Sequence, residues 1–194
     1  GLLTVDELPV RRRSGSGQYL YYLTAKGRRR LAQELGVAIK DVPYRRPGQL
    51  SDFKLLHHLQ CVDLSVSVRL SCQRLGYRLV QELTDEQLKQ LLEPHQVTYR
   101  MRRDPADPDS VATWQGMSVP DYFFIVEAQG RLFAHLVEVD RGTITVRSGR
   151  PGLRDFKRRV LILSELYKSR LYHQLFSQAG NSFRYLVITN GGKD

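Results

Sequence analysis

The sequence predicts an α/β protein in which helices cover a central β-sheet, preceded by a smaller basic segment. Two segments, Pro120–Glu127 and Arg131–Asp140, are apolar at successive positions, as expected for central strands that are covered on both faces. A long amphipathic segment and then a short apolar segment follow them along the chain. The elements of this region are therefore expected in the order helix, strand, strand, strand, helix, strand.

The first fifty residues predict a β-hairpin followed by a helix. Arg11–Arg13 and a Ser/Gly run precede the aromatic segment Gln18–Thr24, a pattern typical of a hairpin with a basic tip. Thr24 is a favourable N-cap residue and Gly36 a favourable stop, so a helix is expected between them. Residues 37–50 are rich in Pro, Gly and Arg and form the best candidate for a domain boundary.

The middle of the chain predicts two further helices. Residues 51–76 are nearly uncharged, with apolar residues at helical spacing from Leu55 onward, although Leu64–Cys72 also alternates as a strand would. The length of this segment favours the helix. The second helix is expected to begin after Thr84, which can cap it, and to end at Pro94.

Periodicity and turn residues predict the remaining elements. Val97–Arg103 is expected to be the first strand of the core, and residues 104–116 a loop. A tight turn at residues 128–130 joins the two central strands into a hairpin. Leu153–Gln178 is expected to be one long amphipathic helix, and Phe183–Thr189 a closing strand.

Composition and charge narrow the class of protein. The 194 residues include 30 Lys and Arg against 20 Asp and Glu, which gives a net charge of +10 and a pI near 9.9. This excess favours a polyanionic partner, of which nucleic acid is the commonest. No apolar run is long enough for a membrane helix and no signal-peptide pattern begins the chain. Two cysteines are too few for a disulfide framework, so we expect a cytoplasmic protein without a membrane partner.

Three carboxylates lie at positions where a carboxylate is costly. Asp121 begins an otherwise apolar strand, and Glu138 and Asp140 end the next one on the same face, because alternate side chains of a strand point the same way. Such a group favours a bound cation, and Mg²⁺ prefers one or two carboxylates with water and phosphate oxygens. The alternative is a turn role for Asp121 and ion pairs for the other two, with arginines such as Arg141 or Arg159.

The histidines and cysteines favour packing over metal binding. His57, Cys61 and Cys72 could share one helix face, but a zinc site needs about four closely spaced ligands. Buried core is therefore the favoured interpretation for them. His135 points away from Glu138 on its strand and is expected to be a packed histidine.

Pro120-Asp121 followed by Glu138-Val139-Asp140, in this order of elements, resembles the restriction-endonuclease-like PD-(D/E)XK nuclease superfamily, whose αβββαβ core has a mixed central sheet. More narrowly, the chain resembles the replication-relaxation family of plasmids and integrative elements. Four features carry that likeness: Tyr22-Leu23-Thr24-x-x-Gly27, the apolar helix with His57 and His58, Pro120-Asp121, and Glu138–Thr143. The resemblance implies a partial winged helix-turn-helix over residues 1–45, made of the wing hairpin and a helix, and a nuclease-like domain over residues 50–194.

The superfamily resemblance also implies roles for the acidic residues. Asp121, Glu138 and Asp140 would hold Mg²⁺ or Mn²⁺, which activates a water for attack on a DNA phosphodiester. Asp140 stands where the superfamily normally has a lysine. That lysine can move to the following helix, where Lys157 is the candidate and Lys168 the weaker one. Without it the site would bind metal and cut poorly or not at all.

Basic clusters predict contacts with DNA phosphates, which position a protein without reading sequence. A run of like charge is usually a solvated face, but several such clusters on one chain favour a DNA surface. The leading hypothesis is a DNA-binding, Mg²⁺-dependent nuclease of plasmid or mobile-element replication or relaxation. The alternatives are a catalytically inactive DNA-binding accessory factor that keeps the nuclease fold as a scaffold, and a module for a relaxase or replication complex. The residues expected to contact DNA are Arg11, Arg12, Arg13, Arg28, Arg100, Arg102, Arg103, Arg158 and Arg159.

Overall fold

The structure is a computed structural model that describes residues 1–7, 19–42, 52–102, 107, 109–140, 156–180 and 182–189. The chain divides into two compact units, residues 1–58 and residues 59–194. Helix α2 (Asp52–Leu75) runs across this division, and most of its length belongs to the second unit.

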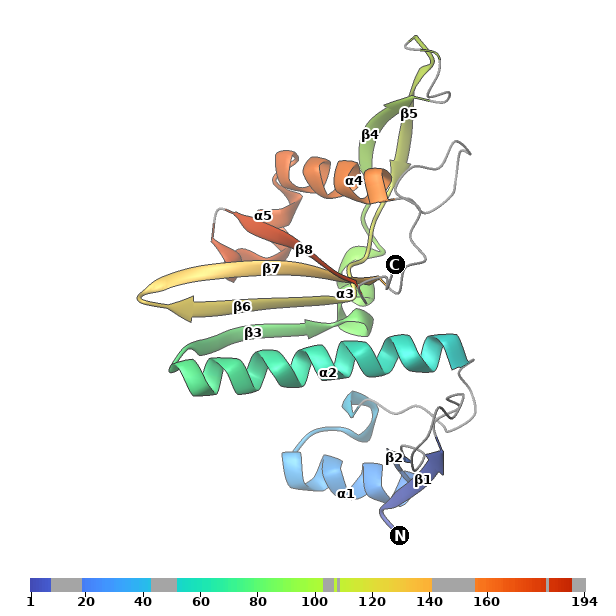
Figure 1. The fold of residues 1–194 in the computed structure, drawn as a ribbon, viewed down its shortest axis with the longest axis vertical. Helices are drawn as coiled ribbons and strands as arrows, with labels where there is room; N and C mark the ends of the chain where they lie inside the picture. The colour runs from blue at the N-terminus through green and yellow to red at the C-terminus, as the bar shows by residue number, and fades with distance from the viewer. Residues whose placement is uncertain are drawn as a thin grey trace, which may run out of the picture. The chain divides into compact units, whose positions relative to one another are not determined.

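The first unit contains the predicted hairpin and helix (Figure 1). Strands β1 (Leu3–Glu7) and β2 (Tyr19–Leu23) pair antiparallel, and helix α1 (Ala25–Leu35) follows directly, before the short 3₁₀ helix η1 (Ile39–Asp41). The helix ends at the predicted glycine, Gly36, which adopts a left-handed conformation with φ of 65°.

Thr24 and Gly27 join the start of helix α1 to the chain that leads into β1. The Thr24 hydroxyl accepts a hydrogen bond from the Gly27 backbone N–H (3.0 Å) and donates to the carbonyl of Leu2 (3.1 Å). A β-carbon at Gly27 would lie 2.1 Å from that same Leu2 carbonyl oxygen. The Thr24-x-x-Gly27 spacing is therefore a packing requirement, because only glycine lets the helix approach this backbone.

The second unit is a sandwich of helices around a four-stranded mixed sheet (Figure 1). The strand order is β3-β6-β7-β8; β3, β6 and β7 are antiparallel neighbours, and β8 is parallel to β7. After α2, its elements are β3 (Arg78–Thr84), α3 (Asp85–Leu92), β4 (Val97–Arg102), β5 (Val111–Gly116), β6 (Tyr122–Ala128), β7 (Arg131–Asp140), α4 (Phe156–Lys168), α5 (Leu171–Leu175), η2 (Ser177–Ala179) and β8 (Phe183–Thr189).

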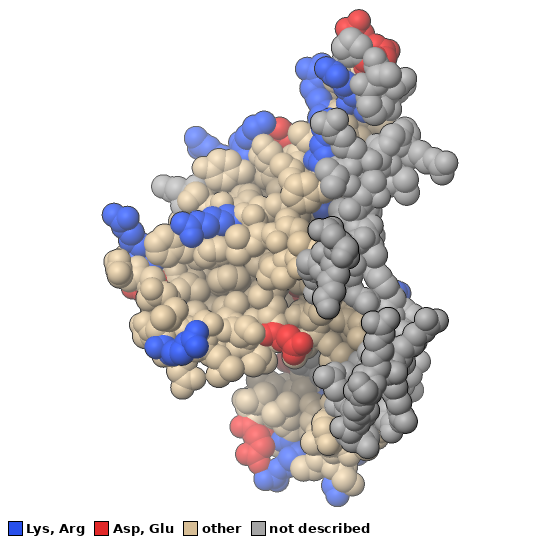
Figure 2. Space-filling view, in the orientation of Figure 1, with Lys and Arg blue, Asp and Glu red and all other residues tan. Residues whose placement is uncertain are grey.

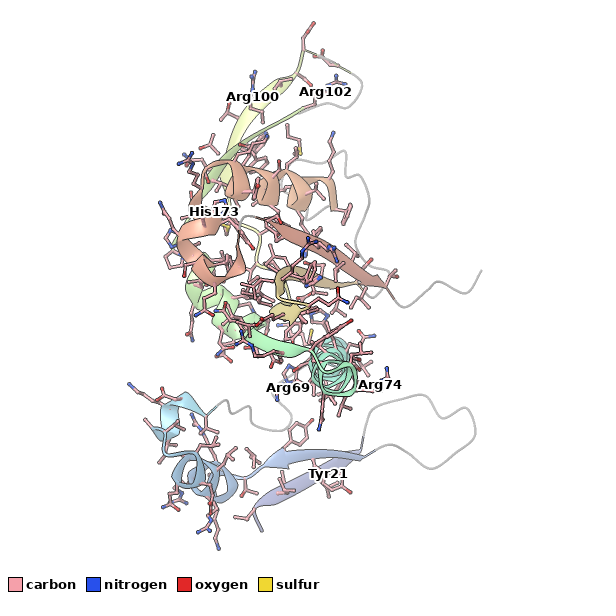
Figure 3. All side chains as sticks on the ribbon, turned by 90° about the vertical axis from the view of Figure 1, so that its left-hand side faces the viewer. Tyr21, Arg69, Arg74, Arg100, Arg102 and His173 are labelled. Carbon is pink, nitrogen blue, oxygen red and sulfur yellow. The ribbon has the colours of Figure 1, made fainter. Side chains whose placement is uncertain are left out.

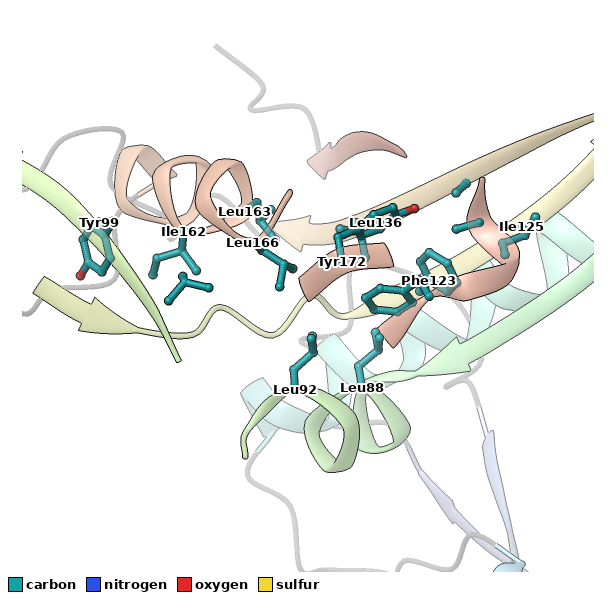
Figure 4. Packing of buried hydrophobic residues seen from close by; sticks show 14 residues of the cluster. Leu88, Leu92, Tyr99, Phe123, Ile125, Leu136, Ile162, Leu163, Leu166 and Tyr172 are labelled. Carbon is teal, nitrogen blue, oxygen red and sulfur yellow. The ribbon is translucent and has the colours of Figure 1, made fainter. Parts of the chain in front are cut away.

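Helices cover both faces of the sheet, as the apolar central strands require. On one face, Tyr122, Phe124 and Val126 of β6 pack with Cys72 and other residues of α2. The opposite face carries the larger core, in which sheet residues meet side chains of α3, α4 and α5 (Figure 4). The predicted long helix over 51–76 is thus confirmed, and Leu64, Val68 and Cys72 are the residues by which it packs on the sheet.

The first strand of the sheet is not the one that the sequence predicted. Val97–Arg102 forms β4, whose partner among the described strands is β5 in a separate two-stranded ribbon, so its expected place in the central sheet is wrong. β5 itself lies in the stretch 104–116 that was expected to be a loop. The position beside β6 is taken by β3, Arg78–Thr84. The polar residues Gln81 and Glu82 interrupt the apolar pattern from which a covered strand would be predicted in the sequence.

Glu82 is accommodated in the sheet because three side chains bind its carboxylate. Ser65 donates to Oε1, the Tyr122 hydroxyl donates to the same oxygen at 2.7 Å, and Arg69 binds Oε2 at 2.8 Å. Burial alone would raise the pKa of Glu82, but these hydrogen bonds and the charge of Arg69 hold the pKa below its usual value. The network joins α2 to β3 and β6.

Two turns define the remainder of the second unit. Gln129 and Gly130 both have positive φ, 52° and 71°, so β6 and β7 are joined by the tight hairpin turn that the sequence predicts. The predicted helix over 153–178 is not continuous. Arg170 adopts a left-handed conformation (φ 61°) and separates α4 from α5, which returns the chain toward the sheet. Among the described helices, none has the length and hydropathy needed to cross a bilayer.

Candidate acidic site and basic ribbon

Asp121, Glu138 and Asp140 lie at the same end of the paired strands β6 and β7, although their carboxylate oxygens are not all within 4.8 Å of one another. Glu138 and Asp140 lie on the face of β7 that carries Leu136, which is the face covered by α4. Asp121 immediately precedes β6 and is held against β7 by two hydrogen bonds. Its backbone N–H donates to the Val137 carbonyl (2.9 Å), and its Oδ2 accepts from the Val139 N–H (2.8 Å). This anchoring orients the Asp121 carboxylate independently of any ligand.

Glu138 is the most buried of these carboxylates, with 3% of the residue exposed. Its Oε1 is ion-paired with a guanidinium nitrogen of Arg159 on α4. Its Oε2 is buried and has no hydrogen-bond partner among the described residues. A buried carboxylate oxygen without a partner is rare in folded proteins, because its desolvation is then uncompensated. This oxygen is therefore an acceptor to which a cation or a hydrogen-bond donor could bind.

The lysines proposed for this site lie on the outer side of α4. Lys157 and Lys168 are both exposed, and Lys168 is paired with Glu165 at 2.7 Å. The cation that reaches Glu138 is instead Arg159, two residues after Lys157. An ion pair between Glu138 and Arg159 was the alternative that the sequence left open.

Two residues lie near Asp121 whose place there the sequence did not predict. Tyr185 of β8 has a buried hydroxyl with no hydrogen-bond partner in the described part of the chain. Burial raises the pKa of Tyr185 to about 12; the charge of Arg159 opposes this rise and that of Asp121 adds to it. The Cys61 sulfur of α2 lies within 4.8 Å of a carboxylate oxygen of Asp121. Neither has a motif signal, because each is brought to the site by an element distant in sequence.

Cys72 does not share a metal site with Cys61. Cys72 is buried against the sheet with a pKa raised by burial, and it lies eleven residues beyond Cys61 on α2. That separation is about 16 Å along a helix. A single ion cannot bind both thiols.

Some of the arginines predicted to contact DNA are exposed to solvent, and others contact neighbouring residues of the chain. Arg100 and Arg102 are exposed on one face of β4, opposite Thr113 and Val111 of β5, and they project from the ribbon (Figure 3). Figure 2 shows this basic surface in blue, below an acidic tip in red. We call the two-stranded sheet of β4 and β5, in which β4 carries Arg100 and Arg102, the basic ribbon.

The other basic residues have structural contacts or lie outside the described residues. The Arg28 guanidinium donates to the carbonyls of Val42 (2.9 Å) and Lys40 (3.3 Å) within the first unit. Arg158 lies over the ring of Tyr99 at 5.8 Å, between α4 and the basic ribbon. Arg11, Arg12, Arg13 and Arg103 fall outside the part of the chain that the structure describes.

Comparison with known proteins identifies the family. The family model described as Replication-relaxation matches residues 2–158, which is most of the chain. The chain therefore belongs to the replication-relaxation family, and this indicates a role in plasmid or mobile-element replication or relaxation. No curated protein and no solved structure matches it.

Proposed function

We propose that this chain binds DNA and hydrolyses phosphodiester bonds with a divalent cation held by Asp121, Glu138 and Asp140, in the replication or relaxation of a plasmid or mobile element. The observation that carries the proposal is the buried Oε2 of Glu138, which has no hydrogen-bond partner among the described residues, at the end of the strand pair that also carries Asp121 and Asp140. Replication-relaxation membership supports DNA as the substrate.

The topology of the second unit supports a nuclease-like fold. The succession α2, β3, β6, β7, α4, β8, with three antiparallel strands and a parallel fourth, has the αβββαβ order of the restriction-endonuclease-like superfamily. In this interpretation α3 and the basic ribbon are insertions between the first and second core strands. The hairpin and helix of the first unit correspond to the wing and last helix of a winged helix-turn-helix.

The residues of the acidic group suit Mg²⁺ or Mn²⁺. Both ions favour carboxylate oxygens, and Oε2 of Glu138 is a buried acceptor that lacks a partner among the described residues. When bound, the cation would polarise the phosphodiester and activate a water. The chain's own contribution is orientation: the Val139 N–H fixes Asp121, and the guanidinium of Arg159 fixes Glu138. Arg159 would also offset phosphate charge near the site.

The basic ribbon supplies the DNA contact in this proposal. Arg100 and Arg102 are two residues apart on one exposed face, so both guanidiniums can reach the same phosphate backbone. The opposite face of the ribbon packs on α4, because Tyr99 belongs to the core and Gly116 lies close to Arg158 and Ile162. This packing connects the ribbon to the helix that carries Arg159. A two-stranded ribbon is also one of the elements that fit the major groove of DNA.

A second candidate function follows from the Glu138–Arg159 pair. A guanidinium that already neutralises the central carboxylate takes the electrostatic place of a metal ion. The chain would then be a DNA-binding accessory factor that keeps a nuclease-like scaffold without cleavage. Two further observations favour this candidate. Residue 140, where the superfamily normally has a lysine, is an aspartate, and Lys157, the candidate replacement, is exposed.

Incubation with supercoiled plasmid in Mg²⁺ or Mn²⁺ separates the two functions. The proposal predicts nicking that is lost with EDTA and in Glu138→Gln, and kept in Glu165→Gln, a matched glutamate on the outer side of α4. Retarded but intact plasmid under all conditions would establish the accessory factor. Equal cleavage by wild type and Glu138→Gln would show that the acidic group takes no part in the reaction.

A further inference from the structure

A second site candidate lies at the hairpin end of the sheet, away from the acidic group. A pocket of about 450 Å³ opens there, and its wall includes Tyr77, Phe133, His135, Arg131 and Arg184. Its volume falls within the range of small-ligand sites, about 300–1,000 Å³. All these residues belong to the second unit.

The pocket and the acidic group are on opposite faces of β7. Phe133 and His135 are odd-numbered positions of the strand and share the face of Val137, which packs toward α2. Glu138 and Asp140 point to the other face. Phe133 and Glu138 are also five residues apart, which is about 17 Å along a strand. The pocket is therefore separate from the proposed cation site.

Aromatic rings and arginines dominate the pocket wall. The Arg184 guanidinium lies over the Phe133 ring, 5.3 Å from its centroid, and the exposed Tyr77 provides a second ring. Arg131 and Arg184 provide two positive charges, and no carboxylate lines the pocket among the described residues. A ligand with an aromatic ring and an anionic group matches this combination.

His135 contributes a titratable ring to the pocket wall. Its ring is stacked on Phe124, with centroids 4.6 Å apart, and its buried Nδ1 has no hydrogen-bond partner among the described residues. Burial, and then the charge of Arg184, lower the pKa of His135, so the imidazole is neutral at pH 7. A neutral imidazole has one nitrogen that donates a hydrogen bond and one that accepts, and the tautomer decides which is which.

We propose that this pocket binds a nucleotide, whose base stacks on Tyr77 and whose phosphate binds Arg131 and Arg184. The same chemistry is present in a free nucleotide and in the 5′-terminal unit of a DNA strand. The proposal is independent of cleavage at the acidic group, since it concerns the other face of the sheet.

Titration of the full chain with dAMP, deoxyadenosine and a 5′-phosphorylated oligonucleotide tests the proposal. We expect the phosphate-bearing ligands to bind at least about tenfold more tightly than deoxyadenosine, because two charge-assisted contacts depend on the phosphate. Binding of dAMP would identify a free nucleotide as ligand, and binding of the oligonucleotide alone would identify a strand end. Failure of both ligands to bind at millimolar concentration would overturn the proposal.

Two variants and a control locate the binding. Arg184→Gln and Arg131→Gln should each weaken phosphate-ligand binding by about tenfold. Arg131 is exposed at the hairpin turn, so its substitution tests the site even if Arg184→Gln disturbs packing on Phe133. Lys89→Gln removes an equal charge on α3 and should leave binding unchanged. Unaltered binding in both arginine variants would place the ligand elsewhere.

Discussion

Arg159 on α4 is ion-paired with Glu138 on β7, and the two side chains are only 17% and 4% exposed. The pair joins the helix that covers the sheet to the strand that carries the acidic group. It is also the feature on which the two candidate functions differ, since the same guanidinium can position a metal ligand or replace the metal.

Removal of the guanidinium should leave an uncompensated buried carboxylate. We expect Arg159→Gln to lower the free energy of unfolding by about 3 kcal/mol, measured by urea denaturation, because a broken buried pair costs more than a pair removed whole. The double variant Glu138→Gln/Arg159→Gln should lose less than the sum of the two single variants. Additive losses would contradict a direct coupling between the residues.

Mg²⁺ should stabilise Arg159→Gln more than it stabilises the wild type, if the acidic group binds the ion. The reason is that the cation then supplies the charge that Arg159 no longer supplies to Glu138. Thermal unfolding at increasing MgCl₂, with NaCl at matched ionic strength as control, measures this difference. An equal response of both proteins would favour the accessory-factor function.

Asp121→Asn isolates the charge of Asp121 from its anchoring role. The amide oxygen can still accept from the Val139 N–H, so the fold should be kept, while a charged metal ligand is lost. Under the nuclease proposal, plasmid cleavage should fall by about a hundredfold or more. Asp85→Asn, at a partly exposed aspartate paired with Lys89, is the matched control and should cleave as the wild type does.

The basic ribbon should determine part of the salt dependence of DNA binding. Each phosphate contact contributes about 0.9 to the slope of log K against log salt, so Arg100→Gln/Arg102→Gln should reduce that slope by about 2. Fluorescence anisotropy with a duplex at several salt concentrations measures it. Lys89→Gln/Lys168→Gln removes the same charge from two helices and should leave the slope nearly unchanged. A reduction as large in this control would mean that net charge alone governs binding.

The Glu82 network should make the stability of the second unit depend on pH. Because the pKa of Glu82 is lower in the folded chain, its stabilisation is complete above the unfolded pKa and is lost as the pH falls below about 4. Glu82→Gln should remove this part of the pH dependence. Tyr122→Phe deletes one donor to the carboxylate and should cost about 2 kcal/mol at pH 7 by urea denaturation, and less at pH 3. An equal cost at both pH values would assign the loss to packing.

Gly27→Ala should disrupt the first unit although alanine favours helices. The added β-carbon would lie 2.1 Å from the Leu2 carbonyl oxygen, which is backbone and cannot move aside like a flexible side chain. Hydrogen exchange of the full chain should show faster exchange in α1 and β2. Ala32→Gly, which lowers helix propensity at a buried position of the same helix, is the comparison for a loss that leaves the β1 contact intact.

The sequence was informative where local pattern and tertiary environment agree. The paired central strands β6 and β7 were predicted because residues such as Phe123 and Leu136 fill both faces with apolar side chains. The caps of α1 were predicted because Thr24 and Gly36 have conformational preferences that operate within a few residues. Asp121, Glu138 and Asp140 were selected for the same kind of reason, since a carboxylate in an apolar strand is conspicuous.

The sequence was misleading where a contact between distant elements decides the outcome. β3 was missed because Glu82 looks too polar for a covered strand, and only Ser65, Arg69 and Tyr122 make its burial tolerable. β4 was placed in the sheet because its alternation fits any amphipathic strand; the alternation does not say which partner it pairs with.

The sequence by itself determined the basic character of the chain, the hairpin and capped helix of the first unit, the apolar central strands and the three carboxylates. Tertiary structure alone decided that β3 completes the sheet and that the helix is interrupted at Arg170, between α4 and α5. It also decided that Arg159 faces Glu138 while Lys157 faces outward. The physical reason is range. Propensity and periodicity act over a few residues, whereas strand pairing and the partner of a buried charge depend on which distant surfaces the core brings together.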